Sequence, residues 1–142
     1  MTDDLYQEII LDHYRNPRGF RDLADEEVDA EADNPNCGDH IRVHVDREDG
    51  MLREIACDGS GCAICMASTS MMTERLAGRR EDEADRQAAA FIAHMRGEAE
   101  LAEDELEDLA ALTGVKQYPM RIKCATLAWH ALRKALGREA AD

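Results

Sequence analysis

The sequence has little that would let the protein span a membrane or bind a nucleic acid. No stretch approaches the roughly 18 consecutive apolar residues that a membrane helix needs. The N-terminus lacks the basic stretch and apolar run of a secretory signal. The 17 Lys and Arg residues are outnumbered by 31 Asp and Glu residues, and the formal net charge of −14 would repel phosphate groups. We therefore expect a cytoplasmic protein that binds neither membranes nor nucleic acids.

Aromatic residues are also scarce, at 4% of the chain. A core with so few of them depends on Ile, Leu, Val, Met and Ala, which suits packed helices better than an all-β sandwich. The length of 142 residues, 44% of them hydrophobic, is usual for one domain. No internal repeat or low-complexity linker divides the sequence. We predict one helix-rich domain over residues 1–142.

Five segments have the spacing of helices. In residues 3–14, Leu5, Ile9, Ile10 and Tyr14 fall near one face of such a helix. Further helices are predicted over residues 62–77, 81–96, 104–112 and 121–136. Three of these segments are followed by glycines, at positions 78, 114 and 137, which is typical of helix ends.

Two strands are predicted in the first half of the chain. From 40 to 46, Ile41, Val43 and Val45 alternate with polar residues, which is the pattern of a half-buried strand. Asp49-Gly50 follows as a hairpin turn, so a second strand over about 51–57 should pair with the first. We expect one more strand, with a weaker pattern, within the acidic segment 21–36.

The five cysteines carry the main chemical signal. Their odd number and the reducing compartment favour thiols or metal ligands over a disulfide framework. Cys37 in NPNCGD, Cys62 in GSGC and Cys124 near the start of the last helix each lie beside a turn or a helix N-terminus, where a thiolate is favoured. Together with Asp39 they offer three sulfurs and one carboxylate. That number matches the four ligands of a zinc site.

The remaining cysteines and the histidines have simpler interpretations. Cys57 and Cys65 are expected to be buried core residues. Cys62 and Cys65 form a C-x-x-C pair, but a thioredoxin-like site would need a βαβ context that is absent. His40 competes with Asp39 as a ligand, and we favour Asp39 because neighbouring strand residues point in opposite directions. The other histidines should have surface or packing roles, and no hydrolase or phosphate-binding motif occurs.

Four motifs occur along the chain, and together they resemble those of a known family. They are LYQEIILDHYRNPRGF, NPNCGD, DGSGCAICMASTSMMTE and GVKQYPMRIKCATLAWHAL. They resemble the SufU proteins of the wider IscU/NifU N-terminal family, over about residues 5–136. The resemblance implies an α+β fold in which a small antiparallel β-sheet packs against several α-helices, with a metal site at one exposed end.

The resemblance also implies roles for particular residues. It makes Cys37, Asp39, Cys62 and Cys124 the zinc ligands, Cys37 the sulfur acceptor, and Arg121 the cation that steadies the exchanged thiolate. The implied activity is that of a zinc-dependent sulfurtransferase. It accepts persulfide sulfur from a SufS-like cysteine desulfurase and supplies downstream iron–sulfur assembly proteins.

Two other functions are compatible with the same residues. One is a scaffold on which a [2Fe–2S] cluster is assembled and transferred. Lys123 stands where scaffold relatives usually carry a histidine, and the helical stretch 81–97 supplies the extra length of SufU proteins, so both features favour sulfur transfer. The other is an adaptor with a structural zinc, which Asp39 disfavours because closed structural sites use Cys and His.

Overall fold

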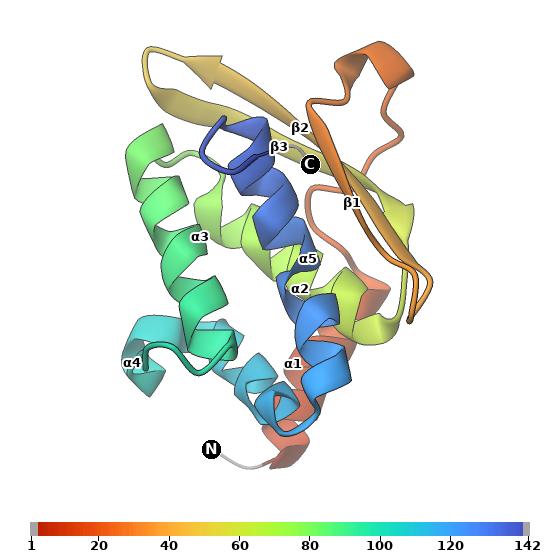
Figure 1. The fold of residues 1–142 in the computed structure, drawn as a ribbon, viewed down its shortest axis with the longest axis vertical. Coiled ribbons are helices and arrows are strands. Elements are labelled where there is room, and N and C mark those ends of the chain that lie inside the picture. Colours follow the sequence, from red (N-terminus) through yellow and green to blue (C-terminus); the bar gives the residue numbers. More distant parts are fainter. Residues whose placement is uncertain (1–2, 141–142) are drawn as a thin grey trace.

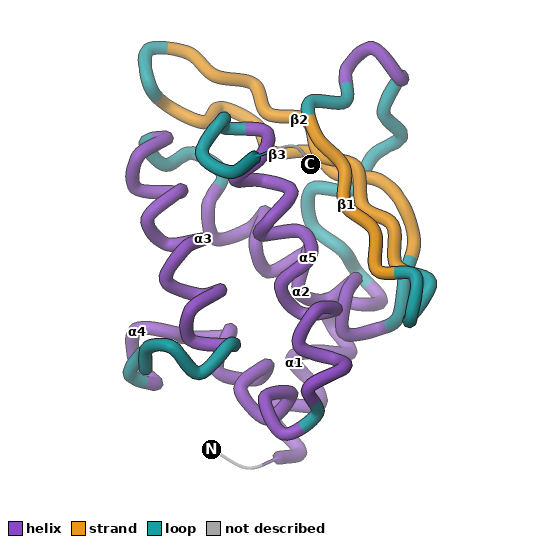
Figure 2. Tube along the Cα trace, in the orientation of Figure 1, coloured by secondary structure: helices purple, strands orange, loops and turns teal. Residues whose placement is uncertain are grey.

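The computed structural model describes residues 3–140, which form a small sheet covered by helices (Figure 1). The elements in chain order are α1 (Asp3–Arg15), the 3₁₀ helix η1 (Asp25–Glu27), β1 (Ala30–Asn34), β2 (Asp39–Glu48), β3 (Met51–Ser60), α2 (Ala63–Leu76), α3 (Glu81–Met95), α4 (Glu103–Leu106), the 3₁₀ helix η2 (Glu107–Gln117) and α5 (Pro119–Ala135). Figure 2 shows the strands gathered on one side of the helices. The predicted α+β class, with a small antiparallel sheet against several helices, is confirmed.

The sheet has the order β1-β2-β3, with both pairs antiparallel. Along β2, the side chains of Ile41, Val43 and Val45 are buried and the residues between them are half-buried, as the alternation predicts. The hairpin turns at Asp49-Gly50, where both residues have positive φ, at 55° and 80°. Paired positive φ angles match the twist of a two-residue hairpin. The third predicted strand is β1, and β3 runs three residues beyond the predicted end, to Ser60.

The core lies between the sheet and the helices. One cluster of buried side chains joins β2 and β3 to α2, α3 and α5. Near its centre, the rings of Phe91 and Trp129 lie 4.4 Å apart between centroids. The Trp129 indole N–H donates to Ser68 Oγ at 2.9 Å, and the Ser68 hydroxyl donates to the carbonyl of Ala125. The few polar atoms of this core are therefore satisfied, as burial requires.

The structure tests for membrane-spanning helices, but it does not test the predicted extent of the domain. Among the helices of residues 3–140, none is long and apolar enough to cross a membrane. The single domain over residues 1–142 stays a prediction, and limited proteolysis would test it.

The buried face of α1 agrees only in part with the predicted one. Of the four residues predicted to fall near one face, Ile9 and Ile10 pack against the core, whereas Leu5 and Tyr14 are 41% and 47% exposed. The packed face runs from Tyr6 through Ile10 to His13, which is 2% exposed. These three residues have the i, i+4, i+7 spacing of one helix face, and α2 and η2 contact it. Two polar-tipped residues on this face made it hard to recognise from hydrophobicity.

The segment 104–112 forms two short helices where one was predicted to end at Gly114. α4 ends after one turn, Glu107 has a φ of 52°, and η2 then continues past Gly114 to Gln117. The guanidinium of Arg75, from α2, donates hydrogen bonds to the carbonyls of the last two residues of α4, at 2.6 and 2.9 Å. These carbonyls would bond the next turn of an α-helix. A contact from a distant helix thus ends α4.

Candidate metal site

The turn between β1 and β2 carries two of the predicted ligands. The Cys37 backbone N–H donates to the carbonyl of Asn34 at 3.2 Å, which closes a turn with Pro35 at its second position. Gly38 follows with a φ of +70°, a conformation that L-residues with a side chain rarely adopt. The turn leaves Cys37 half-buried and places Asp39, at 2% exposure, at the first position of β2.

Two glycines let the junction between β3 and α2 approach this turn. A Cβ on Gly59 would lie 2.0 Å from the carbonyl oxygen of His40, and one on Gly61 would lie 2.5 Å from Asp39 Oδ1. Both distances are far below van der Waals contact, so neither position accommodates a side chain without a shift. The close approach allows the backbone N–H of Cys62 to donate to Asp39 Oδ1 at 2.8 Å.

Cys62 also begins α2. Its Sγ accepts a hydrogen bond from the backbone N–H of Cys65 at 3.5 Å, so the thiol is the N-cap of this helix. The predicted location of Cys62 beside a helix N-terminus is therefore confirmed.

Cys124 lies in the second turn of α5 and is 1% exposed. The prediction that a helix N-terminus would favour its thiolate is therefore wrong, because the helix begins five residues earlier at Pro119. Burial raises the pKa of the Cys124 thiol, and the neighbouring side chains of Cys37, Asp39 and Cys62 raise it further. A bound cation would oppose this effect by favouring the thiolate.

The structure brings three of the predicted ligands into one group. The Sγ atoms of Cys37 and Cys124 and a carboxylate oxygen of Asp39 all lie within 4.8 Å of one another. Cys62 is outside this group of three, but its N–H is bonded to Asp39 and its side chain borders Cys124. Sulfur and carboxylate donors at this spacing suit one zinc ion. The site draws on the β1–β2 turn, β2, the start of α2 and α5.

Asn34 completes this group and was missed by the sequence analysis. Its side chain is 2% exposed, and its Nδ2 lies 3.5 Å from both Asp39 Oδ2 and Cys124 Sγ. The only signal in the sequence was a polar residue at the end of a strand, just before the proline and cysteine of NPNCGD. Nothing in that pattern indicates a buried side chain.

Arg121 lies on α5 one turn before Cys124, and it is exposed. It lines a surface hollow of about 600 Å³ together with Tyr6, Ile10, Ile64 and Tyr118. Because residues three apart on a helix share a face, Arg121 and Cys124 lie on the same side of α5. Its backbone N–H donates to the carbonyl of Tyr118, within the first turn of the helix. The role of its guanidinium beside Cys37 stays a prediction.

The other two cysteines are core residues, as predicted. Cys57 and Cys65 are both fully buried. Burial raises the pKa of Cys57 to about 12, and it raises the pKa of Cys65 as well. Protonated buried thiols are poor nucleophiles. In the C-x-x-C pair, the Cys62 sulfur therefore caps α2 and the Cys65 sulfur belongs to the core.

His40 points away from the site. Its ring is bonded to Asp33, on the neighbouring strand, whereas Asp39 turns inward and is buried. The preference for Asp39 over His40 as a ligand agrees with this alternation. His94 has the predicted packing role, because it is 1% exposed and its ring bonds Leu101 and Thr113.

A second group of possible ligands surrounds His13. Its side chain and those of Glu74 and Asp108 offer ligand atoms within 4.8 Å of one another. However, His13 Nδ1 is bonded to Ser70 Oγ at 2.7 Å, and Arg18 Nε pairs with Glu74 Oε2 at 3.2 Å. The Arg18 charge opposes a bound cation. We interpret this group as an ion-pair network beside a buried histidine.

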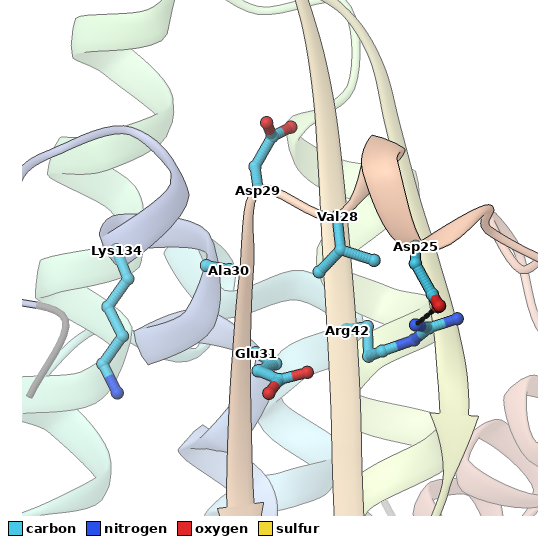
Figure 3. A pocket seen from close by; sticks show the side chains of 7 residues that line it. All are labelled: Asp25, Val28, Asp29, Ala30, Glu31, Arg42 and Lys134. Atoms are coloured by element: carbon cyan, nitrogen blue, oxygen red, sulfur yellow. Dashed lines mark hydrogen bonds and ion pairs between the residues drawn. The ribbon is translucent and has the colours of Figure 1, made fainter.

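A further hollow, of about 550 Å³, lies along β1 (Figure 3). Asp25, Asp29 and Glu31 line it with Arg42 and Lys134. Figure 3 shows Arg42 reaching Asp25, and the two are joined at 2.9 Å. None of the predicted ligands lies among its described lining residues. The part of its lining that the structure describes contains an ion pair and no cysteine, so it offers no thiol for sulfur chemistry.

Comparisons with known proteins agree with the fold. Residues 5–125 match the family described as NifU-like N terminal domain. The chain is 38% identical over 137 residues to the zinc-dependent sulfurtransferase SufU of Bacillus subtilis, covering 96% of this chain and 92% of that protein. It is 38% identical over 136 residues to the iron–sulfur cluster assembly scaffold protein IscU of Streptococcus pyogenes, covering 96% and 85%.

A solved structure is also similar. It is described provisionally as an iron–sulfur cluster assembly scaffold protein for the SUF system of Fervidobacterium islandicum. It matches with a TM-score of 0.79 and 30% identity, over 96% of this chain and 99% of that one. The chain therefore belongs to the family of NifU-like N-terminal domains. The resemblance to SufU-type members that the four motifs indicated is confirmed.

Proposed function

We propose that this chain is a zinc-dependent sulfurtransferase that accepts persulfide sulfur from a cysteine desulfurase for iron–sulfur cluster assembly. The observation that carries the proposal is the group of two thiols and one carboxylate within 4.8 Å. Of these three side chains, only Cys37 is partly exposed, whereas Asp39 and Cys124 are buried. A sulfur acceptor must be reached by another protein. Cys37 is the member of the group that meets this requirement.

The donor set fits zinc. Cys37, Cys62 and Cys124 would supply three sulfurs and Asp39 one oxygen, which is the number that tetrahedral zinc takes. When bound, zinc would keep these thiols deprotonated and protect them from oxidation. Because the pKa of Cys124 is raised, this buried sulfur needs a nearby positive charge, such as that of zinc, to be a thiolate at neutral pH. These four residues, which the sequence resemblance also implied, are the zinc ligands that we propose.

The transfer step is a thiol–persulfide exchange at Cys37. The Cys37 thiolate attacks the terminal sulfur of a persulfide on the desulfurase, and a new S–S bond forms on Cys37. The S–S bond of the donor breaks, and the donor cysteine leaves as a thiolate. The exposed guanidinium of Arg121 would stabilise negative charge during this exchange.

The proposal specifies partners and a compartment. The sulfur donor is a SufS-like cysteine desulfurase, and the persulfide on Cys37 goes on to downstream iron–sulfur assembly proteins. Both reactions need thiols that stay reduced, which is the condition of the cytoplasm. The relative from Bacillus subtilis, named a zinc-dependent sulfurtransferase, supports this choice.

The experiment is desulfurase turnover with zinc-loaded protein. Wild type should stimulate turnover strongly and gain the mass of one sulfur on Cys37, whereas Cys37→Ala should do neither. Cys57→Ala is the matched control, because it removes a thiol of the core that lies outside the site. Full stimulation by Cys37→Ala would overturn the assignment of Cys37.

The alternative is a scaffold for a [2Fe–2S] cluster. It is favoured by the IscU relative, which is as similar in sequence as the SufU relative. The same cysteines are chemically suited to a cluster. A zinc-loaded protein that gives no stimulation, and that assembles a stable cluster from iron and sulfide, would favour this function over sulfur transfer.

A further inference from the structure

Asn34 contacts several of the proposed metal ligands, although no role was predicted for it. It is the last residue of β1 and pairs in register with Asp39, the first residue of β2. Its backbone carbonyl accepts the Cys37 N–H, and its side-chain Nδ2 lies 3.5 Å from both Asp39 Oδ2 and Cys124 Sγ. One buried residue therefore reaches three of the four proposed ligands.

The fourth proposed ligand is connected through Asp39. Oδ1 of this carboxylate accepts the N–H of Cys62 at 2.8 Å, while Oδ2 faces Asn34. The carboxylate is thus held from both sides by N–H donors. Hydrogen bonds of this kind orient metal ligands, and the loss of one typically lowers metal affinity or activity about 10- to 100-fold.

The chemistry of the amide fits this position. A primary amide has two N–H donors on one nitrogen, and here its two neighbours are a carboxylate and a sulfur. When a metal is bound, both neighbours are anions, so both contacts are charge-assisted. The side chain is 2% exposed, and water cannot easily replace it.

We infer that Asn34 is the positioning residue of the metal site: its side-chain amide holds Asp39 and Cys124 as ligands by donating one hydrogen to each. This inference rests on the proposed function. The hydrogen bond between Cys37 and Asn34 runs from the Cys37 backbone N–H to the Asn34 carbonyl, so the Asn34 amide is directed at Asp39 and Cys124 and not at the sulfur that would exchange. Asp39 and Cys124, together with Cys62, are the ligands that stay in place in the proposed function.

Cobalt binding tests this role without measuring activity. Zinc-free wild type, Asn34→Ala, Asn34→Asp and the control Asn36→Ala are titrated with Co²⁺ against a competing chelator. Asn36 is an exposed asparagine of the same turn, so its variant matches the chemical change away from the site. The absorption band from thiolate-to-cobalt charge transfer is recorded for each protein.

Asn34→Ala should bind Co²⁺ about 10- to 100-fold more weakly than wild type. Its charge-transfer band should move to lower energy, because a thiolate without an N–H donor gives up an electron more easily. Asn34→Asp should bind still more weakly, since it directs a carboxylate at two anions. Asn36→Ala should match wild type in affinity and band position.

The outcomes separate this inference from the proposed function. Wild-type affinity and an unshifted band in Asn34→Ala would overturn the role of Asn34 while leaving the metal site intact. A wild type that binds neither zinc nor cobalt would overturn the proposed function and this role with it. Should the alanine variant fail to fold, Asn34→Ser keeps one donor, and wild-type affinity with an unshifted band in that protein would also overturn the role.

Discussion

Two groups of potential metal ligands differ in this molecule by what surrounds them. The Cys37 group and the His13 group each bring three ligand atoms within 4.8 Å of one another. The first is mostly buried, and its carboxylate is held by N–H donors. In the second, two exposed carboxylates share their surroundings with Arg18, which already pairs with Glu74. Ligand atoms are equally close in the two groups, so what distinguishes them is burial, the N–H donors at Asp39 and the ion pair between Arg18 and Glu74.

The largest difference between the two groups should appear when one potential ligand is removed from each of them. Cys124→Ala should weaken zinc binding by about 3–5 kcal/mol, which is more than a hundredfold, because the buried zinc ion would lose one of its anionic ligands. His13→Gln should leave the zinc affinity and the stoichiometry of one ion unchanged. Competition with a chelator measures both. A loss of zinc in the His13 variant would show that the comparison between the two groups is wrong.

Zinc removal should change stability next. With free zinc at 100 times its Kd, binding adds about 2.7 kcal/mol to the free energy of unfolding. A chelator should remove this contribution from wild type, which thermal unfolding would detect as a lower Tm. Cys124→Ala should unfold at nearly the same temperature with and without the chelator. Equal sensitivity of the two proteins would place the stabilising zinc elsewhere.

A smaller effect is expected from Gly61→Ala. Its new Cβ would lie 2.5 Å from Asp39 Oδ1, so the carboxylate or the start of α2 must shift. Zinc affinity should fall about tenfold, as it does when support of a ligand is lost. Gly114→Ala, which meets no atom within 4 Å, is the matched control and should bind zinc normally. Similar affinities in the two variants would contradict the tight contact.

The smallest effect concerns the His13 group and pH. Burial, and then the Arg18 charge, lowers the pKa of His13 below its ordinary value near 6.5. Below about pH 6.5, His13 is therefore protonated more readily in the unfolded chain than in the folded one. The free energy of unfolding should fall as the pH decreases below that value. The slope from one group is at most about 1.4 kcal/mol per pH unit. Urea unfolding at several pH values, with chelator present, should show a flatter dependence in His13→Gln, and parallel curves would contradict the shift.

Much of the fold could be predicted from local patterns. The alternation of Ile41, Val43 and Val45 located β2, and the apolar positions of 81–96 located α3, whose Phe91 and Met95 are buried. These patterns work because a strand or a helix repeats over a few residues. The full buried face of α1 and the form of 104–117 could not be predicted, because packing against α2 and hydrogen bonds from Arg75 decided them.

The candidate site divides in the same way. The residues with suitable chemistry can be recognised in the chain, because the cysteines lie beside turns and Asp39 stands two positions after Cys37. The burial of Cys124 in the second turn of α5, and its contact with Asn34, 90 residues earlier, are visible only in the folded molecule. Turns and periodicities depend on neighbouring residues, whereas burial and hydrogen bonds between distant segments exist only once the core has packed.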